Sequence, residues 1–363
     1  MRHSELDLQA DRIEAVLATH RAPARVTGGV VTPRLVRFHL APWPGVRLRR
    51  LLGLAEELAL ALDVPGCRLA RDSGAFALEV PRPHPAPVEL FRVCARLTHV
   101  PPCAPLIGLD EQGTPLLLSL PSPDVAHVLI AGSTGSGKTV LARSMVASLA
   151  MHSRLGQLQL ILVDPKGRGF APFAGLPHLL CPIVTDPVAA SARLAWLVQE
   201  MARRDREAIT APRLVLVIDE LADLVATAAG SVEALTRLTQ RGREAGIHVI
   251  AATQKPSTAL LGPLMKANFP VRLVGSVASA DDARVAAGLP GTQAERLLGR
   301  GDFVLVVRGR CSRFQAAYAG PQELVDLVAR LHEGGRTSRR WPGAPPAIAA
   351  QRALAALPSA PLR

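Results

Sequence analysis

The chain has 363 residues and a formal net charge of +12, so it can form two or three domains with a large core, and its basic surface suits a polyanion such as nucleic acid. No stretch of 18 residues lacks a charged residue and the first residues hold no apolar signal core, which argues against a membrane-spanning helix and a secretory leader. The five cysteines form no C-x-x-C pair, so neither a zinc ribbon nor a disulfide framework is indicated, and the cytoplasm is the expected compartment.

Residues 1–98 predict a small α+β domain, and residues 99–126 predict a linker with a hairpin-like stretch at 115–120. The elements expected in the first domain are a helix over 1–20, a turn at 26–29, a strand over 34–40, an amphipathic helix over 46–62, strands near 67–71 and 76–80, and a proline-rich break at 81–87.

Strands and helices alternate from residue 127, which predicts an α/β domain over 127–333 with a mostly parallel, doubly wound sheet. The expected strands cover residues 128–131, 158–163, 213–218, 247–252, 271–275 and 302–307. The expected helices cover residues 138–150, 187–207, 231–244, 258–267 and 321–332. Residues 334–363 are rich in proline and alanine and are expected to be a disordered tail.

Residues 132–139 spell G-x-x-x-x-G-K-T between an apolar strand and a helix, which is the context of a phosphate-binding P-loop rather than of an unliganded glycine-rich turn. Glycines permit a tight turn, and the helix N-terminus adds positive potential. We expect Lys138 to contact the β and γ phosphates of ATP and Thr139 to ligate Mg²⁺. The predicted nucleotide-binding residues are Gly132, Ser133, Thr134, Gly135, Ser136, Gly137, Lys138, Thr139 and Val140.

An apolar strand over 214–218 ends in Asp219 and Glu220, which is a Walker B pattern. We expect Asp219 to hold Mg²⁺ through water and Glu220 to orient or deprotonate the attacking water. Gln254 follows the next strand, where an amide can sense the γ-phosphate or simply cap a turn. Asp164-Pro165-Lys166 ends an earlier strand at the same edge of the sheet, where ligands bind in such folds; a structural turn is the alternative.

Lysine is rare in this chain, although Lys and Arg together number 42. Only four positions are lysine, and all lie in the second domain: Lys138, Lys166, Lys255 and Lys266. A chain that otherwise uses arginine keeps lysine where a compact point charge matters, so the other three are also candidate site residues.

Eight stretches between residues 127 and 303 stand in a characteristic order: AGSTGSGKT, VDPK, LPHLL, VTD, VIDELADL, GIHVIAATQKPS, LMKANFPVR and LLGRGD. Together they resemble the motor region of the FtsK/SpoIIIE family of DNA translocases. The first domain resembles, more weakly, the α-domain of that family through residues 34–46 and the helix that follows.

The resemblance implies a RecA-like P-loop ATPase that forms a hexameric ring around double-stranded DNA, with ATP sites between subunits. By motif alignment, Arg243 falls where a neighbour supplies an arginine finger, and Lys266 falls at a second trans-acting basic position. Lys255 and Arg284 fall on loops that face the DNA backbone. For all four residues the alternative is an ordinary surface charge. The implied catalytic set is Lys138, Glu220, Gln254, Arg243 and Lys266.

Two features depart from the family pattern: the segment between Met201 and Arg213 is much shorter than usual, and Ala280 stands where a basic residue is usual. The sequence is also expected to lack a membrane anchor and a winged-helix domain. The leading hypothesis is an ATP-driven translocase on double-stranded DNA, acting in chromosome segregation or DNA transfer with a membrane or recombination partner that the sequence does not name. An FtsK-like ATPase of a protein-secretion or plasmid-conjugation system, and an ATP-dependent scaffold, are the alternatives.

Overall fold

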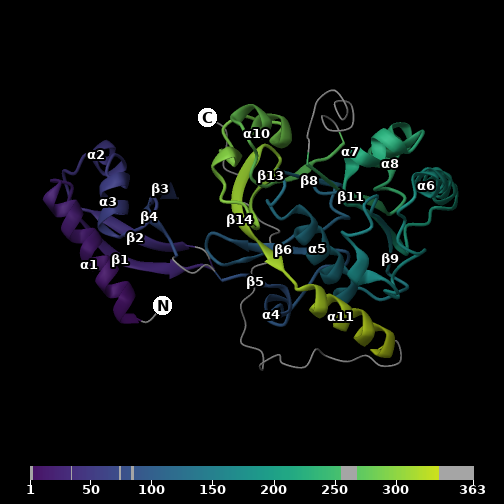
Figure 1. Ribbon diagram of the computed structural model, residues 1–363, viewed down its shortest axis with the longest axis horizontal. Coiled ribbons are helices and arrows are strands. Elements are labelled where there is room, and N and C mark those ends of the chain that lie inside the picture. The colour runs from purple at the N-terminus through teal and green to yellow at the C-terminus, as the bar shows by residue number, and fades with distance from the viewer. Residues whose placement is uncertain (1–2, 34, 73–74, 83–85, 255–267, 335–363) are drawn as a thin grey trace. The chain divides into compact units, whose positions relative to one another are not determined.

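The computed structural model describes residues 3–33, 35–72, 75–82, 86–254 and 268–334 (Figure 1). The chain divides into two compact units, Met1–Pro87 with Glu111–Thr114, and Val88–Asp110 with Pro115–Arg363. Residues 88–98, which the sequence analysis grouped with the first domain, therefore belong to the second unit. The reason is that β5 (Val88–Glu89) pairs with a strand of the second unit and that Leu90 and Cys94 lie in its core.

The first unit holds a four-stranded antiparallel sheet in the order β1-β2-β4-β3. Its elements are α1 (His3–Thr19), β1 (Ala24–Val31), β2 (Leu35–Pro42), α2 (Leu48–Leu52), α3 (Ala55–Ala61), β3 (Arg68–Asp72) and β4 (Ala75–Pro81). A shared core formed by Ile13 and Leu17 of α1, Phe38 of β2, Leu58 of α3 and Leu78 of β4 holds helices and sheet together. Burial of these apolar side chains is the main stabilising contribution in a unit of this size.

Two local predictions for the first unit were wrong. The expected turn at 26–29 lies inside β1, where the register shifts between Val26 and Gly28 and Gly28 has φ +148°. The glycine that suggested a turn therefore lies at a β-bulge inside the strand. The helix expected over 46–62 is two short helices, because the first ends at Gly53, a poor helix former, and the second begins at Ala55.

The second unit is built on a sheet in the order β7-β6-β14-β13-β12-β8-β11-β10-β9, with β5 paired to β14. Its strands are β5, β6 (Leu106–Asp110), β7 (Pro115–Leu117), β8 (Val128–Ala131), β9 (Leu158–Val163), β10 (Arg213–Ile218), β11 (Ile247–Thr253), β12 (Val271–Val274), β13 (Asp302–Val307) and β14 (Arg310–Tyr318). The strands β12, β8, β11, β10 and β9 are parallel, whereas β13, β14, β6 and β7 pair in antiparallel fashion. The α/β class is confirmed, with a parallel centre and an antiparallel extension.

Helices cover both faces of the parallel strands, which explains why those strands are mostly apolar. The helices are α4 (Leu90–Cys94), α5 (Lys138–His152), α6 (Pro187–Glu207), α7 (Leu221–Thr227), α8 (Ser231–Arg241), α10 (Ala280–Ala287) and α11 (Pro321–Gly334). On one face α5 and α11 pack over alternate strand residues such as Ile130 and Val217. On the other face α6, α7 and α8 pack over residues such as Leu129 and Leu216.

The expected helix over 258–267 and the expected tail lie outside the described residues, apart from Gly334 at the end of α11. Among the helices that are described, none combines the length and the apolar character needed to cross a bilayer.

Candidate functional site

The P-loop joins β8, a central strand between β11 and β12, to the N-terminus of the buried helix α5. Gly132, Gly135 and Gly137 have φ of +154°, +83° and +103°, a backbone region that side chains rarely adopt. A Cβ on Gly132 would lie 2.8 Å from Ser136 Oγ, and one on Gly137 would lie 3.0 Å from the Gly301 nitrogen. Conformation therefore favours glycine at all three positions, and limited space adds to this preference at Gly132 and Gly137.

Lys138 begins α5 and is buried, with its Nζ donating to the Ser133 carbonyl across the loop at 2.9 Å. Burial lowers the pKa of the Lys138 ammonium, while the nearby carboxylates of Glu220 and Asp219 raise it. The ammonium thus lies in the loop between the backbone amides and the acids at the end of β10. A phosphate chain bound in the loop would therefore contact both the backbone amides and the Lys138 ammonium.

Thr139 and Asp219 meet directly, with Thr139 Oγ1 donating to Asp219 Oδ1 at 2.7 Å. Burial raises the pKa of Asp219, the hydrogen bond from Thr139 lowers it, and the charge of Asp164 raises it again. Val163 and Ile218 pair at the ends of β9 and β10, so Asp164 and Asp219 leave the sheet side by side.

Asp164 is fully buried, and its two oxygens differ in their partners. Oδ2 accepts from the Phe170 amide at 3.0 Å, whereas Oδ1 has no hydrogen-bond partner among the described residues. An unpartnered buried carboxylate oxygen beside a hydroxyl and a second carboxylate fits a hard divalent cation such as Mg²⁺. The donor set supplied by Thr139, Asp219 and Asp164 is therefore compatible with the predicted metal.

Glu220 is 4% exposed and is held by the end of β11. Its Oε1 accepts from Thr253 Oγ1 at 2.9 Å, and the Gln254 amide lies 3.2 and 3.3 Å from its two oxygens. Thr134 Oγ1 in turn donates to Gln254 Oε1 at 3.0 Å, because Thr253 pairs with Ala131 directly before the P-loop. Glu220, Gln254 and the P-loop therefore form one connected group. Thr253 lies in the GIHVIAATQKPS stretch, but its residue type alone does not predict a role in the site.

A contact that the sequence analysis missed comes from residues 299–301, here called the strap. The Arg300 amide donates to the Gly135 carbonyl at 3.1 Å, and the Gly301 amide donates to the Ser136 carbonyl at 2.8 Å. Asp302, which follows the strap, makes a two-pronged ion pair with Arg313 of β14 at 2.9 and 2.7 Å. The carbonyls of Gly135 and Ser136 are thus held by the LLGRGD stretch, while the amides of Ser133 and Ser136 donate to the carbonyls of Ser276 and Ser133.

Lys166 lies at the same edge as Asp164 but forms an ion pair with Asp223 of α7 at 3.2 Å, with both side chains about half exposed. The hydrogen bond with Asp223 raises the pKa of Lys166. Arg143 of α5 donates to the carbonyls of Arg168, at 2.7 Å, and Gly169, and so ties the loop after Lys166 to the helix after the P-loop.

Arg243 does not approach the P-loop of its own chain. It lies in the turn between α8 and β11, at the amino ends of the parallel strands, whereas the P-loop follows the carboxyl end of β8. The pKa of His127 is lowered to about 3 and that of His248 to about 4, mainly by burial, and the nearby charge of Arg243 contributes to both shifts. Since His127 directly precedes β8, Arg243 and the P-loop lie at opposite ends of that strand. The Arg243 guanidinium lies 3.6 Å from Glu244 and is 39% exposed.

The remaining predicted residues fall elsewhere. Arg284 lies on α10, 63% exposed and 3.6 Å from Asp281. Lys255 and Lys266 lie outside the described residues, so their surroundings stay predictions.

The sequence profile of the FtsK/SpoIIIE family matches residues 97–211 and 205–258, and that of the FtsK alpha domain matches residues 1–82. The DNA translocase FtsK of Sporosarcina ureae is 34% identical over 358 residues, covering 89% of this chain and 45% of that protein. The chain belongs to the FtsK/SpoIIIE family. It spans between 37% and 49% of the length of the first curated family members that it matches.

Solved structures agree with the family's P-loop ATPase fold. The cytoplasmic domain of the type VII secretion ATPase EccC from Thermomonospora curvata superposes with a TM-score of 0.59 at 24% identity, over 68% of this chain and 34% of that one. The pCW3 conjugation coupling protein TcpA, in its monomer form with ATPγS, superposes with a TM-score of 0.58 at 18% identity, over 88% of this chain and 99% of that one. At these identities the likeness shows that the FtsK/SpoIIIE-family chain shares a fold with both.

Proposed function

We propose that the protein hydrolyses ATP and uses the energy to move along double-stranded DNA. The observation that carries the proposal is the convergence of Lys138, Thr139, Asp219 and Glu220 on one edge of a RecA-like sheet in a chain about one-third identical to a DNA translocase. The curated relatives are longer than this chain, so their activity is proposed for it rather than transferred.

Binding of the nucleotide is assigned to the P-loop. Its amides and Lys138 bind the phosphates, and the strap holds the carbonyls of Gly135 and Ser136. Thr139 and Asp219 would hold Mg²⁺ at the carboxyl ends of the strands, with the buried carboxylate of Asp164 beside Asp219. When bound, Mg²⁺ neutralises charge on the β and γ phosphates.

Hydrolysis requires a base for the attacking water, and Glu220 has this role in the proposal. Thr253 and the Gln254 amide orient its carboxylate. The Gln254 side chain, bonded to Thr134 of the P-loop, links the position of this base to the occupancy of the phosphate site. Water attack on the γ-phosphorus breaks the bond to the bridging oxygen, and Glu220 accepts the proton of the water.

Stabilisation of the transition state is assigned in trans to Arg243, with Lys266 as a second basic group. Arg243 lies at the edge opposite to its own P-loop, so it reaches a nucleotide only if that nucleotide belongs to another copy of the chain. This favours a homo-oligomer, proposed to be a hexameric ring. Lys255 and Arg284 are proposed to contact the DNA backbone.

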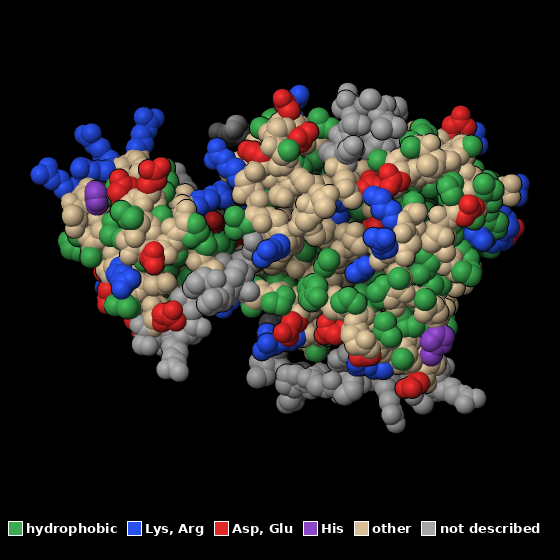
Figure 2. Space-filling model, in the orientation of Figure 1, with side chains coloured by type: hydrophobic (Ala, Val, Ile, Leu, Met, Phe, Trp, Pro, Cys, Tyr) green, Lys and Arg blue, Asp and Glu red, His purple; other side chains and the backbone are tan. Residues whose placement is uncertain are grey.

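Duplex DNA is the proposed track because the chain carries +12 net charge and because FtsK, its relative, is named a DNA translocase. On the face shown in Figure 2, Lys and Arg side chains lie in small groups among Asp and Glu and form no single basic patch over the described residues. A protein-secretion or conjugation role is the alternative, and it is supported by shared fold alone.

The deciding experiment measures ATP turnover with and without long duplex DNA over a range of protein concentrations. We expect turnover per subunit to rise cooperatively with concentration and to rise further with DNA. Turnover that is indifferent to DNA at every concentration would contradict the translocase proposal and favour a secretion ATPase or a scaffold.

A further inference from the structure

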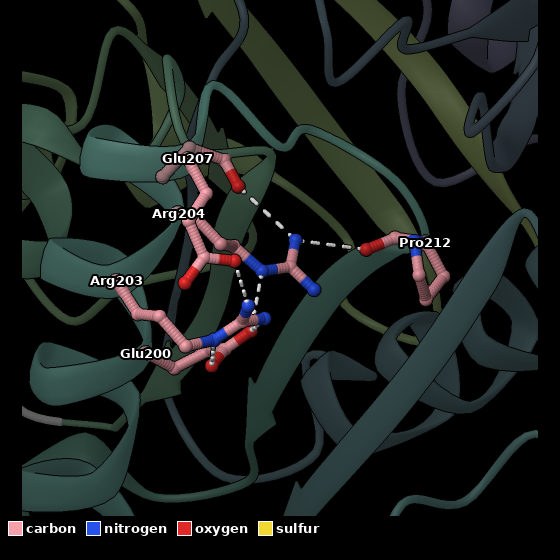
Figure 3. A network of polar contacts seen from close by, with 6 residues as sticks. Glu200, Arg203, Arg204, Glu207 and Pro212 are labelled. Atoms are coloured by element: carbon pink, nitrogen blue, oxygen red, sulfur yellow. Dashed lines mark hydrogen bonds and ion pairs between the residues drawn. The ribbon is translucent and has the colours of Figure 1, made fainter.

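A buried guanidinium ties the end of α6 to the turn that carries Arg243 (Figure 3). Arg204 is 3% exposed, and its Nε donates to Glu200 Oε1 at 2.7 Å. Its Nη1 donates to the carbonyl of Pro212 at 2.9 Å and to that of Ala245 at 3.1 Å. One side chain therefore joins three segments: the last turns of α6, the connection to β10, and the turn before β11.

The connection over 208–212 belongs to the segment between Met201 and Arg213, for which the sequence predicts a departure from the family pattern, and it lies tightly against the turn over 242–246. Gly246 has φ +69°, and a Cβ there would lie 2.2 Å from the Thr210 carbonyl oxygen. The Leu214 amide donates to the Gly246 carbonyl at 2.9 Å, and the Gly246 amide donates to the Arg243 carbonyl at 3.0 Å. The backbone that carries Arg243 is thus fixed from the side of the short connection.

Anchoring by a buried ion pair is a costly way to attach a helix, because desolvation of both charges offsets most of their attraction. Apolar residues attach the rest of α6, for example Leu197 and Met201. A guanidinium adds geometric specificity, since its planar arrangement of N–H donors fixes the positions of several acceptors at once. The hydrogen bond from Arg203, followed by those from Arg204, lowers the pKa of Glu200 to about 2, so this carboxylate stays charged at neutral pH.

The other side of the Arg243 turn is formed by neutral groups. The Nδ1 of His127 accepts from the Val249 amide at 3.1 Å, and the Nδ1 of His248 donates to the Ala126 carbonyl at 3.0 Å. Burial keeps both rings uncharged at neutral pH by lowering their pKa values. Arg243 forms an ion pair with Glu244, which is 78% exposed, and the charge of Arg213 also lowers the pKa of His248. Glu244 is exposed and Arg213 is a cation, so neither fixes the Arg243 side chain as a buried carboxylate would.

We propose that Arg204, oriented by Glu200, is a positioning residue for Arg243: it fixes the 242–246 turn so that Arg243 reaches the nucleotide of a neighbouring subunit. This inference rests on the trans role given to Arg243 in the proposed function. The connection between α6 and β10 also has a role in this proposal, because it brings the Pro212 carbonyl to the guanidinium that binds the Ala245 carbonyl.

The first test compares Arg204→Met with Arg203→Met. Arg203 lies on the same helix and pairs with the same Glu200, but among the described residues it bonds to Glu200 and Glu207 rather than to the backbone of the turn. Arg204→Met should keep the KM for ATP and lower kcat on the order of 10²-fold, the effect of a misplaced catalytic group. Arg204→Lys should fall between, and Arg203→Met should stay within about twofold of wild type, because exposed ion pairs contribute little. An unchanged kcat in Arg204→Met overturns the proposal.

The second test mixes variants, with co-assembly confirmed by native mass spectrometry. Arg204→Met mixed with Lys138→Ala should regain turnover, because some interfaces combine an intact P-loop with a well-placed Arg243. Arg204→Met mixed with Arg243→Ala should regain none, because neither subunit supplies Arg243 correctly. A defect in the P-loop of the Arg204→Met subunit itself would give the opposite pattern and would overturn the proposal.

A parallel mixture of Arg243→Ala with Lys138→Ala separates the two levels of inference. If that mixture regains turnover while Arg204→Met with Lys138→Ala does not, the positioning role alone is overturned. If neither mixture regains turnover, the trans role of Arg243 and the oligomeric mechanism in the proposed function fail as well. Should Arg204→Met fail to fold, as judged by its thermal unfolding, Arg204→Lys replaces it in both mixtures with the same expected pattern.

Discussion

Glu220 and Lys138 make different contributions at the level of single residues. The Glu220 carboxylate is held by Thr253 and the Gln254 amide next to the P-loop, so it is placed to accept a proton rather than to bind phosphate. Glu220→Gln should therefore bind ATP with near wild-type affinity but lower turnover on the order of 10²- to 10⁴-fold, as expected when a general base is lost. Binding of a fluorescent ATP analogue and release of phosphate measure the two effects separately.

Two further variants serve as comparisons for Glu220→Gln. Lys138→Ala should abolish turnover and weaken binding, because the phosphates lose their cationic partner. Thr253→Val keeps the shape of the side chain but removes the hydroxyl donor, so it should lower turnover by less than Glu220→Gln does. Wild-type turnover in Glu220→Gln would show that another group is the base.

The buried histidines beside Arg243 predict an acid sensitivity. His127 has a pKa of about 3 and His248 of about 4 in the folded chain, against an unfolded value near 6.5, with burial as the main cause. The unfolded state therefore binds more protons than the folded state as pH falls below 6.5, and stability falls with it. Between pH 7 and pH 5 the two rings together should lower the free energy of unfolding by about 4 kcal/mol.

Urea unfolding at several pH values measures that loss. The double variant His127→Asn, His248→Asn keeps an amide group near each Nδ1 position but cannot titrate, so its stability should fall less steeply between pH 7 and pH 5. An equally steep fall in the double variant would mean that other groups cause the acid sensitivity.

At the scale of elements, local signals predicted the chain best where capping and burial agree. The bounds of α6 match the prediction because Asp186 caps the helix, accepting from the Ala189 amide at 2.8 Å, and Pro187 occupies its first turn. The apolar parallel strands are equally clear, since each is buried on both faces. By contrast, β14 was not predicted. The first residues of this strand are exposed and mostly polar, and its position is set by pairing with β13 and β6.

The residues of the candidate site also differ in how far local sequence signals predict them. The sequence predicted Lys138, Thr139, Asp219 and Glu220, whose residue types and spacing express their chemistry directly. It could not predict the strap, because the contact between Arg300 and Gly135 joins residues far apart in the chain through backbone groups that no side chain marks. The buried, unpartnered oxygen of Asp164 likewise depends on the packing of the loop up to Phe170.

The strap makes its own prediction. Arg313 is the two-pronged partner of Asp302, which is 4% exposed and also accepts from the Leu298 amide at 2.9 Å. Arg313→Met leaves this carboxylate short of its cation and should destabilise the fold by about 2 kcal/mol, less than for a fully buried pair. It should also weaken ATP binding, because the strap that holds the P-loop carbonyls loosens.

Arg310→Met is the matched control, since Arg310 is an exposed arginine on the same strand. Titration with a fluorescent ATP analogue and thermal unfolding of both variants measure the two effects. Equal ATP affinity in Arg313→Met and Arg310→Met, despite a loss of stability in the former alone, would show that the strap supports the fold without shaping the P-loop.

For the whole molecule, net charge rather than a single patch is the basis on which DNA binding is proposed. The chain carries +12, yet basic and acidic groups are interspersed over the face in Figure 2. Contacts made by arginine and lysine with phosphates release counterions and carry no sequence information, so affinity should depend on salt and not on sequence. We expect log K for duplex DNA to fall linearly with log salt concentration, with the same slope for unrelated duplexes.

The slope also tests individual residues. If Arg284 contacts a phosphate, Arg284→Ala should weaken binding to all sequences alike and reduce the magnitude of the salt slope by about 1, and Lys255→Ala should do the same. Arg92→Ala removes an equal charge from α4 at a position with similar exposure, 68% against 63%, and should leave the slope unchanged. If all three variants reduce the slope equally, binding reflects overall charge rather than these loops, and a sequence-specific footprint at physiological salt would contradict the electrostatic account altogether.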